Sequence, residues 1–351
     1  MPTLIIKAGP TARRLIERDG FTPELFSHMG AAAGGPKWLI LNRLDRALFG
    51  EWFKPRKKSL TVVGASIGNW RMACAAQRDP VAAIERFEAA YLSQRYGLKP
   101  SPREVSEEAW RILRLLLGEN GGTEILSHPR LRLNVVTARC RGWIGSETPF
   151  LQKTALLGAL VSNLASRRLL GLWLQRVILH SPAAAPVALR DDGFATQYAP
   201  LTADNLEAAL MASASIPMAL APVRDIPGAP TGVYLDGGMI DYHMDLSLCG
   251  GMDLPLRDGT ENLLFLPHFC ETVTTGWLDK FLPWRKPENL GNVVLVAPSQ
   301  EFLATLPNGK VPDRHDFWLY AGRDDERIRD WKIAVAEGQR MADEFPIYPN
   351  L

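Results

Sequence analysis

The sequence has little cysteine, little net charge and no internal repeat, and each of these absences excludes a class of protein. Only four of its 351 residues are cysteine, and none lies at the C-x-x-C spacing of a zinc or redox site. The formal net charge of +2 excludes a polycation that binds nucleic acid. We therefore expect reduced, mostly buried thiols in a cytoplasmic protein that has no metal centre and does not bind nucleic acid.

Long apolar runs are also absent. The N-terminal apolar run ends well before Arg13 and Arg14, and it is too short for a signal peptide. The most apolar stretch, residues 154–179, is interrupted at its middle by Arg167 and Arg168, and charges at mid-bilayer cost several kcal/mol. The sequence therefore predicts no membrane-spanning helix, and it leaves peripheral contact with a membrane surface open.

What the sequence does contain is an alternation of apolar strand patterns and helix patterns. Strands are expected at residues 4–6, 59–66, 131–138, 186–189, 232–238, 261–269 and 292–299, and residues 24–35 are expected to form a strand that runs into a glycine–alanine loop. Helices are expected at residues 11–18, 36–53, 68–77, 80–96, 106–118, 202–217 and 325–345. Such alternation is typical of a mainly parallel sheet covered by helices. We predict a three-layer α/β/α fold in one domain of residues 1–351, with a core of about residues 24–245 and a C-terminal extension of about residues 250–351.

Residues 139–186 lack this alternation, and we interpret them as a helical insertion. The helical section of about residues 156–179 within it could cap a binding pocket as a lid. An ordinary packed helix explains the same pattern slightly better.

A candidate nucleophile lies in G-A-S-I-G, residues 64–68. A strand pattern precedes these residues and a helix pattern follows them, which is the context of a nucleophile elbow. A tight turn there would present Ser66, while Gly64 and Gly68 leave room for neighbouring elements. The helix would direct its positive N-terminal dipole toward a developing oxyanion. The motif is short enough to arise by chance, so a plain glycine–serine turn is an equal alternative.

Glycine-rich residues 30–38 lie between another strand pattern and another helix pattern. A phosphate-binding loop fails here, because Pro36 precedes Lys37 and no hydroxyl follows to bind Mg²⁺. An oxyanion hole fits better, with N–H donors from Gly34, Gly35 and Lys37, since proline has no N–H. A glycine turn that only packs is the remaining alternative.

Asp236 is a candidate base. It follows a strand pattern and precedes Gly237 and Gly238, so its carboxylate is expected at the carboxyl end of a strand, where open α/β sheets place their sites. Upstream of it, a helix pattern ends in the small residues A-S-A-S-I-P, residues 212–217.

These blocks together resemble the patatin-like phospholipase family. Residues 33–38, A-G-G-P-K-W, resemble its glycine-rich oxyanion loop, usually written G-G-G-x-R-G. Residues 64–68 match its G-x-S-x-G motif, residues 212–217 resemble its A-S-x-A-x-P block, and residues 236–238 match its D-G-G/A motif. The order and spacing of the four blocks are more specific than any one block, and they lie within roughly residues 24–245.

The resemblance implies a serine acyl hydrolase that cleaves carboxylic esters of lipids with a Ser–Asp dyad and without a cofactor. It assigns Ser66 as nucleophile and Asp236 as base, with an oxyanion and substrate-binding set of Gly34, Gly35, Lys37, Gly64, Gly68, Gly237 and Gly238. An ordinary aspartate is a poor base for a serine hydroxyl. Burial must therefore raise the pKa of Asp236, and its hydrogen bond to Ser66 must be short.

The glycine loop departs from the family pattern at Ala33, Pro36 and Trp38, and Lys37 replaces the usual arginine. We expect Trp38 to narrow the pocket or to pack against the acyl chain. These departures leave two alternatives open. One is a soluble esterase or thioesterase, and the other is a patatin-fold binding or regulatory protein with little turnover.

A Ser–His–Asp triad is the nearest rival mechanism. It needs a histidine after the acid, and His243, His268 and His315 qualify by order. His268 is the best of them because it follows an apolar strand pattern. A lone histidine in that position is more often structural, so the dyad is preferred.

The partner implied by this function is a lipid or another acyl ester. Residues 274–290 combine Trp277, Phe281 and Trp284 with lysine and arginine, a composition that favours membrane interfaces. A surface loop whose tryptophans pack inward explains the same residues. The sequence indicates neither the head group, the acyl length nor the oligomeric state.

Overall fold

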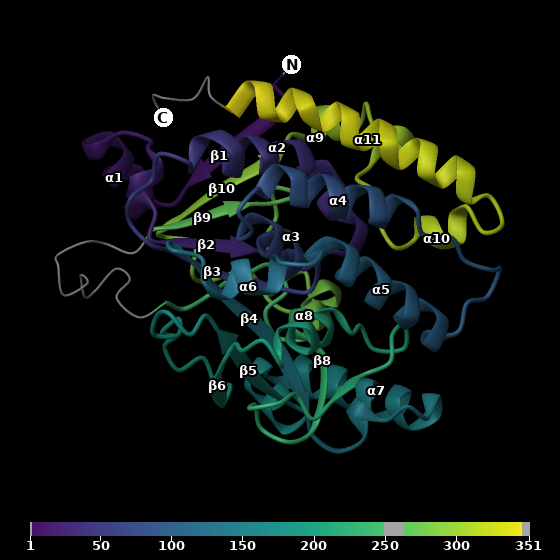
Figure 1. The fold of residues 1–351 in the computed structure, drawn as a ribbon. Coiled ribbons are helices and arrows are strands. Elements are labelled where there is room, and N and C mark those ends of the chain that lie inside the picture. Colours follow the sequence, from purple (N-terminus) through teal and green to yellow (C-terminus); the bar gives the residue numbers. More distant parts are fainter. Residues whose placement is uncertain (1, 249–262, 346–351) are drawn as a thin grey trace.

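The computed structural model describes residues 2–248 and 263–345, in which a mixed, mostly parallel sheet lies between two layers (Figure 1). The strand order is β1 (Leu4–Ala8), β10 (Val293–Pro298), β9 (Leu264–Pro267), β2 (His28–Ala31), β3 (Leu60–Ala65), β4 (Leu131–Cys140), β5 (Leu174–His180) and β6 (Thr196–Pro200). The pairs from β10 to β4 are parallel, and β1–β10 and β4–β5 are antiparallel. Off this path, β8 (Val233–Asp236) pairs with β4 and with β7 (Val223–Arg224). The predicted α/β class with a mainly parallel sheet is confirmed.

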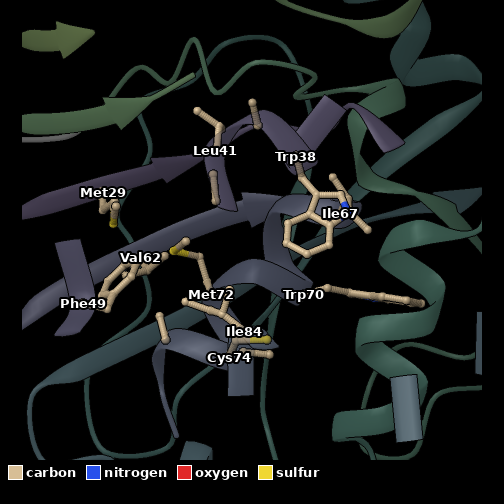
Figure 2. Packing of buried hydrophobic residues seen from close by; sticks show 14 of the residues in the cluster. Met29, Trp38, Leu41, Phe49, Val62, Ile67, Trp70, Met72, Cys74 and Ile84 are labelled. Atoms are coloured by element: carbon tan, nitrogen blue, oxygen red, sulfur yellow. The ribbon is translucent and has the colours of Figure 1, made fainter. Parts of the chain in front are cut away.

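Helices cover one face of the sheet. They are α1 (Pro10–Asp19), α2 (Asn42–Ala47), α3 (Ile67–Ala75), α4 (Pro80–Leu92), α5 (Pro102–Leu117), α6 (Gly121–Leu126), α8 (Leu206–Ala214) and α11 (Asp324–Glu344), the last preceded by α9 (Gln300–Leu303) and α10 (Asp316–Leu319). Figure 2 shows the centre of their core, where Met72 of α3 packs near Val62 of β3. Full burial of such a side chain stabilises the fold by about 1.5–3 kcal/mol.

A thinner layer covers the opposite face. It consists of α7 (Pro149–Ala165), short 3₁₀ helices and the irregular residues 240–248. Val63 of β3 packs there against Tyr242 and its neighbours. Ala155 and Ala159 of α7 pack in a cluster with residues that follow β4 and β8. Because much of this layer is irregular chain, its polar groups need partners from side chains.

The region 139–186 differs from the prediction. Helix α7 and the 3₁₀ helices on either side of it are helical as expected, but Leu174–His180 forms the buried strand β5. A continuous apolar run does not distinguish a buried strand from a buried helix, which explains the error. Residues 186–189, expected as a strand, contribute one isolated bridge between Leu189 and Leu248.

Two findings bear on the expectations about the whole chain, and both are limited to the described ranges. A search of these residues finds no helix with the length and apolarity required to cross a bilayer. Cys74, Cys140 and Cys270 are unbridged, and Cys249 lies outside the described residues.

Candidate active site

The edge of β4 brings Ser66 and Asp236 together. β3 pairs in parallel with β4 as far as Ala65, opposite Val136. β8 pairs antiparallel with the following residues of β4, and Asp236 lies opposite Thr137. The carboxyl ends of β3 and β8 therefore meet head to head along one strand edge. Ser66 directly follows β3, and its hydroxyl lies close enough to the Asp236 carboxyl to lower the pKa of that carboxyl.

Ser66 occupies a strained turn between β3 and α3. Its φ of 55° and ψ of −136° lie in a region that residues with a side chain rarely adopt. Such a conformation persists only where the surroundings hold it, and here the Ser66 N–H donates to Ser213 Oγ at 2.9 Å. The backbone is that of a nucleophile elbow.

Three predicted glycines act by close packing. A Cβ on Gly68 would lie 2.1 Å from the carbonyl oxygen of Ala31, so only glycine lets the start of α3 lie against the end of β2. A Cβ on Gly237 would lie 2.1 Å from the carbonyl oxygen of Val136, and a Cβ on Gly64 would lie 2.7 Å from the side-chain oxygen of Asn69. None of these glycines lines the cavity described below. They bring Ser66, the glycine loop and Asp236 within reach of one another.

Two serines at the end of α8 hold both halves of the pair. Besides the Ser66 N–H, Ser213 Oγ accepts a hydrogen bond from the Asn69 side chain at 2.8 Å and donates to the carbonyl of Val136 at 2.6 Å. The carbonyl of Ser215 accepts the N–H of Asp236 at 2.9 Å. The A-S-A-S-I-P block therefore positions the serine and the aspartate together.

Ser66 and Asp236 line a cavity of about 210 Å³. The glycine loop, residues 216–217, residues 238–242, residues 277–280 and residues 313–315 form its wall. The last two segments lie beyond the four sequence blocks, and no pattern in the sequence connected Lys280 or Arg314 with Ser66. Both are functional candidates that the sequence reasoning missed.

The glycine loop contributes backbone to this cavity. Gly34 and Gly35 line it, and among the described residues their N–H groups have no hydrogen-bond acceptor. The Lys37 N–H instead donates to the Gly34 carbonyl at 3.4 Å inside the 3₁₀ helix η2 (Gly35–Leu41), so only the Lys37 side chain faces the cavity. Two of the three expected donors are therefore available.

Trp38 lies in the core and not at the cavity. It is 1% exposed and stacks on Phe87 of α4 with ring centroids 4.0 Å apart, and Figure 2 shows it among core side chains. The expectation that Trp38 shapes the pocket is wrong. Successive side chains of a 3₁₀ helix point about 120° apart, so when Lys37 faces the cavity Trp38 faces inward.

Burial raises the pKa of Asp236 to about 6. Lost hydration is only partly offset by the nearby Ser66 hydroxyl and by the Gly238 N–H, which donates a hydrogen bond to Asp236 Oδ1 at 2.7 Å. The positive charges of Arg314 and Lys280 contribute less. A carboxylate with this pKa is a better proton acceptor than an ordinary aspartate and is still ionised at neutral pH.

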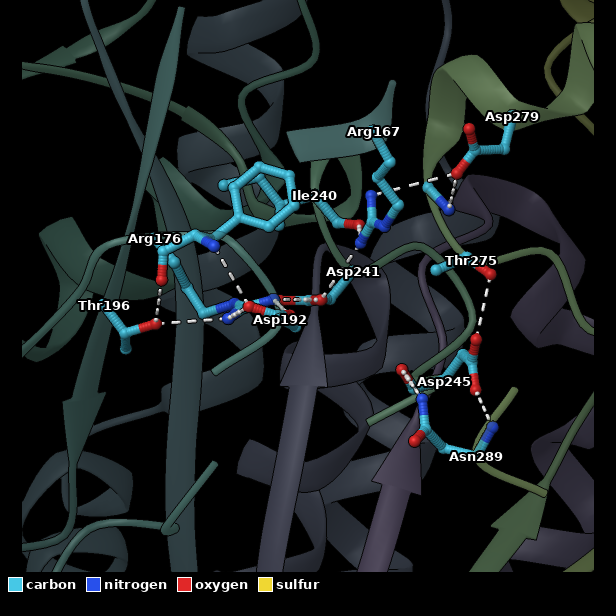
Figure 3. Close-up of polar contacts among 12 residues, drawn as sticks. Arg167, Arg176, Asp192, Thr196, Ile240, Asp241, Asp245, Thr275, Asp279 and Asn289 are labelled. Carbon is cyan, nitrogen blue, oxygen red and sulfur yellow. Dashed lines mark hydrogen bonds and ion pairs between the residues drawn. The ribbon is translucent and has the colours of Figure 1, made fainter. Parts of the chain in front are cut away.

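Buried ion pairs support the cavity wall from behind (Figure 3). Arg176 of β5 pairs with Asp241 at 2.7 Å, and Arg167 donates to the Ile240 carbonyl at 2.8 Å. Arg167 also lies 3.8 Å from Asp279 of the 3₁₀ helix η7 (Trp277–Phe281). These contacts hold the chain that follows the aspartate against the chain that carries Lys280.

Of the histidines in the described part of the chain, only His315 lines the cavity. His268 is fully buried against Phe269, and burial lowers its pKa to about 3. His243 is buried beside it, and its Nδ1 accepts the N–H of Thr274. The fold therefore places neither His243 nor His268 in the cavity with Ser66.

Comparison with known proteins adds little to these observations. No family model and no curated protein matches the chain. Among solved structures, VipD from Legionella pneumophila is similar at 12% identity with a TM-score of 0.36, and the match covers 97% of this chain and 70% of that chain. Similarity of this size does not assign the chain to a family.

Proposed function

We propose that this protein hydrolyses carboxylic esters with Ser66 as nucleophile and Asp236 as base. The strongest support is that Ser66 and the buried Asp236 line one cavity, with the Ser66 hydroxyl close enough to the Asp236 carboxyl to lower its pKa. The same cavity is lined by Gly34 and Gly35, whose N–H groups lack an acceptor within the described ranges. Nucleophile, base and oxyanion donors are the parts that acyl transfer requires.

In this proposal Ser66 Oγ attacks the ester carbonyl and its proton moves to the Asp236 carboxylate. The N–H groups of Gly34 and Gly35 stabilise the tetrahedral oxyanion, and each such donor is typically worth about 3 kcal/mol. As the intermediate collapses, the C–O bond of the ester breaks and protonated Asp236 gives its proton to the departing alcohol. A water molecule then attacks the acyl-enzyme while Asp236 takes its proton, and Asp236 returns this proton to Ser66 Oγ as the acyl–Oγ bond breaks and the acid leaves.

We propose lipid esters as the substrates, because apolar side chains are exposed beside the cavity wall. The outward face of α7 carries Phe150, Leu157, Val161 and Leu164, and Phe281 and Trp284 are 62% and 65% exposed. The two surfaces are joined, since Asn163 of α7 bonds to both Asp279 and Arg285. Trp277 instead lines the cavity. An exposed apolar surface of this kind suits a lipid interface.

The double substitution Phe281→Ala and Trp284→Ala is expected to weaken binding to phospholipid vesicles by tenfold or more, because burying each aromatic side chain contributes about 1.5–3 kcal/mol. Vesicle co-sedimentation measures this, and hydrolysis of a short soluble ester should be unaffected. Ile333→Ala, at an exposed apolar position on α11, is the control and should bind normally. Equal binding by both variants would show that residues 281–284 do not contact lipid.

Ser213→Ala is expected to reduce kcat by about 10- to 100-fold, because a buried N–H left without a partner costs about 1–3 kcal/mol and here that N–H belongs to Ser66. Steady-state kinetics on a p-nitrophenyl ester measures the loss. Ser215→Ala is the matched control. Its hydroxyl donates to Met211 within α8, so its loss leaves the backbone bond to Asp236 intact. Equal losses in the two variants would contradict a specific role for Ser213.

The proposed function is tested with p-nitrophenyl esters of increasing chain length and with a fluorophosphonate probe. Hydrolysis together with labelling at Ser66 supports the dyad. Activity that is confined to short esters and is not increased by vesicles favours a soluble esterase, which the small cavity would also suit. Absence of both hydrolysis and labelling in a folded protein favours the binding or regulatory alternative.

A further inference from the structure

Four buried aromatic rings form a continuous column between the glycine loop and the chain that follows Asp236. This ring column consists, in order, of Phe269, His268, His243 and Tyr242. Phe269 stacks on His268, and their ring centroids are 4.3 Å apart. His268 meets His243 edge to face at 4.3 Å, and His243 stacks on Tyr242 at 4.1 Å. The column therefore joins the end of β9, which His268 directly follows, to the irregular residues 240–248.

One end of the ring column lies against the oxyanion loop. A Cβ on Gly34 would lie 2.6 Å from Cε1 of Phe269, so the edge of this ring occupies the space of the missing side chain. Lys37 of the same loop places its Nζ 4.7 Å from the centroid of the same ring. The contact follows from the strand order, because β2 leads into the loop and pairs in parallel with β9. The loop thus rests on Phe269 at two points.

The other end of the column lies against the residue that hydrogen-bonds the base. A Cβ on Gly238 would lie 3.3 Å from Cδ2 of Tyr242 and 2.8 Å from the Cβ of Ala33. The Gly238 N–H donates to Asp236, and the Tyr242 carbonyl accepts the N–H of Ala33 at 2.8 Å. The same four rings therefore touch the loop that carries the oxyanion donors and the turn that holds the aspartate.

The two histidines in the middle of the column act as neutral rings. Burial lowers the pKa of both, to about 3 for His268, and the charge of Lys37 lowers it further. Their Nδ1 atoms contact backbone groups of Thr274 and Cys270. Their Nε2 atoms have no hydrogen-bond partner within the described ranges. At neutral pH these residues therefore contribute shape to the column, and neither charge nor proton transfer.

We propose that the ring column positions the oxyanion donor Gly34 relative to Asp236, with Phe269 as the residue that holds the glycine loop in place. Close-packed rings transmit strain, so a change at one end of the column moves the group at the other end. A catalytic group must be held within about 0.5 Å of its productive position, and a shift of the loop on this scale weakens the oxyanion contact. The effect on catalysis rests on the proposed ester hydrolysis, whereas support of the loop by the column does not.

The first test is Phe269→Leu, which keeps an apolar side chain and removes the flat ring beside Gly34. We expect kcat on a p-nitrophenyl ester to fall about 10- to 100-fold with KM changed less than about twofold, because the donor acts in the transition state. The Ki of a trifluoromethyl ketone, which forms a tetrahedral adduct with the serine, should rise by a similar factor. Partial unfolding would lower the apparent kcat without changing this Ki.

Phe302→Leu is the matched control. Phe302 of α9 is 2% exposed, as Phe269 is, and it also carries a cation over its ring, since the guanidinium of Arg340 lies 5.2 Å from the centroid. Phe302 does not line the cavity, so its substitution should leave KM and the Ki unchanged. An equal rise of the Ki in both variants, or an unchanged Ki in Phe269→Leu, would overturn the proposal.

Gly34→Ala tests the same contact from the side of the loop. Its methyl group would meet the ring of Phe269, so kcat should fall and the Ki of the ketone should rise. In the Phe269→Ala background the methyl group has room, and the loss caused by Gly34→Ala should be at least about fivefold smaller than in the parent. Losses that multiply independently would show that Gly34 is not held against this ring.

A measurement without turnover separates this proposal from the proposed function. The Ala33 N–H reports whether the loop stays bound to the column, because it donates to the Tyr242 carbonyl. Its hydrogen exchange should be at least about tenfold faster in Phe269→Leu than in Phe302→Leu. If this is found and the parent cleaves no ester, only the proposed function fails. Equal exchange in a parent without turnover, or faster exchange without a rise of the Ki in an active parent, overturns the positioning role.

Discussion

Ser66→Ala is expected to reduce ester hydrolysis by at least about 10³-fold, because removal of a catalytic nucleophile eliminates the covalent route. The substitution removes only the hydroxyl, and the alanine N–H still donates to Ser213 Oγ. Loss of activity should therefore come with little change in the thermal unfolding midpoint. Fluorophosphonate labelling should disappear in parallel with hydrolysis of a p-nitrophenyl ester.

The matched control for this change is Ser181→Ala. Ser181 is also a buried serine, and its hydroxyl has no hydrogen-bond partner among the described residues, so its loss should leave activity and labelling intact. Residual labelling of the Ser66→Ala variant at another serine would contradict the assignment of the nucleophile.

Asp236→Asn is expected to reduce kcat by about 10²- to 10⁴-fold, the usual contribution of a general base. An asparagine oxygen can still accept the Gly238 N–H, and the change in shape is small, but the amide cannot accept the proton of Ser66. Asp313→Asn is the control, because this carboxylate lines the same cavity and is paired with Lys310 instead of Ser66. A comparable loss in both variants would indicate a general effect of cavity charge and not a base.

The role of Asp236 as base also predicts how kcat/KM of the parent protein depends on pH. Asp236 acts as a base only when ionised, and its pKa is raised to about 6, so kcat/KM for a neutral ester should fall about tenfold per pH unit well below pH 6 and level off above about pH 7. An ordinary aspartate would stay ionised down to about pH 4. His315→Gln should keep this profile. If that variant loses the acidic limb while it stays folded, a histidine and not Asp236 is the base.

Several features of the site could be predicted from the sequence because they restrict the residue type at single positions. Ser66 follows an apolar strand pattern and precedes a helix pattern, and a strained turn between two such elements needs small neighbours. Asp236 is followed by Gly237, where the backbone of β4 leaves no room for a Cβ. Close backbone contacts of this kind restrict the residue type at single positions, so they appear as short motifs.

Other features were misread because the same residues fit more than one environment. Trp38 fits a pocket wall as well as a core, and the direction of its side chain was decided by the turn of η2. The apolar run in residues 174–180 fits a buried helix as well as a strand, and pairing with β4 decided it. In both cases a contact with distant residues chose between local states of similar stability.

The sequence by itself determined the class of fold, and it marked Ser66, Asp236 and the glycines that allow close approach as candidate site residues. Only the tertiary structure decided that Ser66 and Asp236 meet. One edge of β4 pairs with β3 as far as Val136 and with β8 from Thr137 onward, so the ends of β3 and β8 lie side by side. The tertiary structure also decided that Lys280 and Arg314 lie beside them. The residues next to Lys280 and Arg314 in the sequence do not predict that these side chains line the cavity. Their positions depend on how the sheet packs against the layer that covers it.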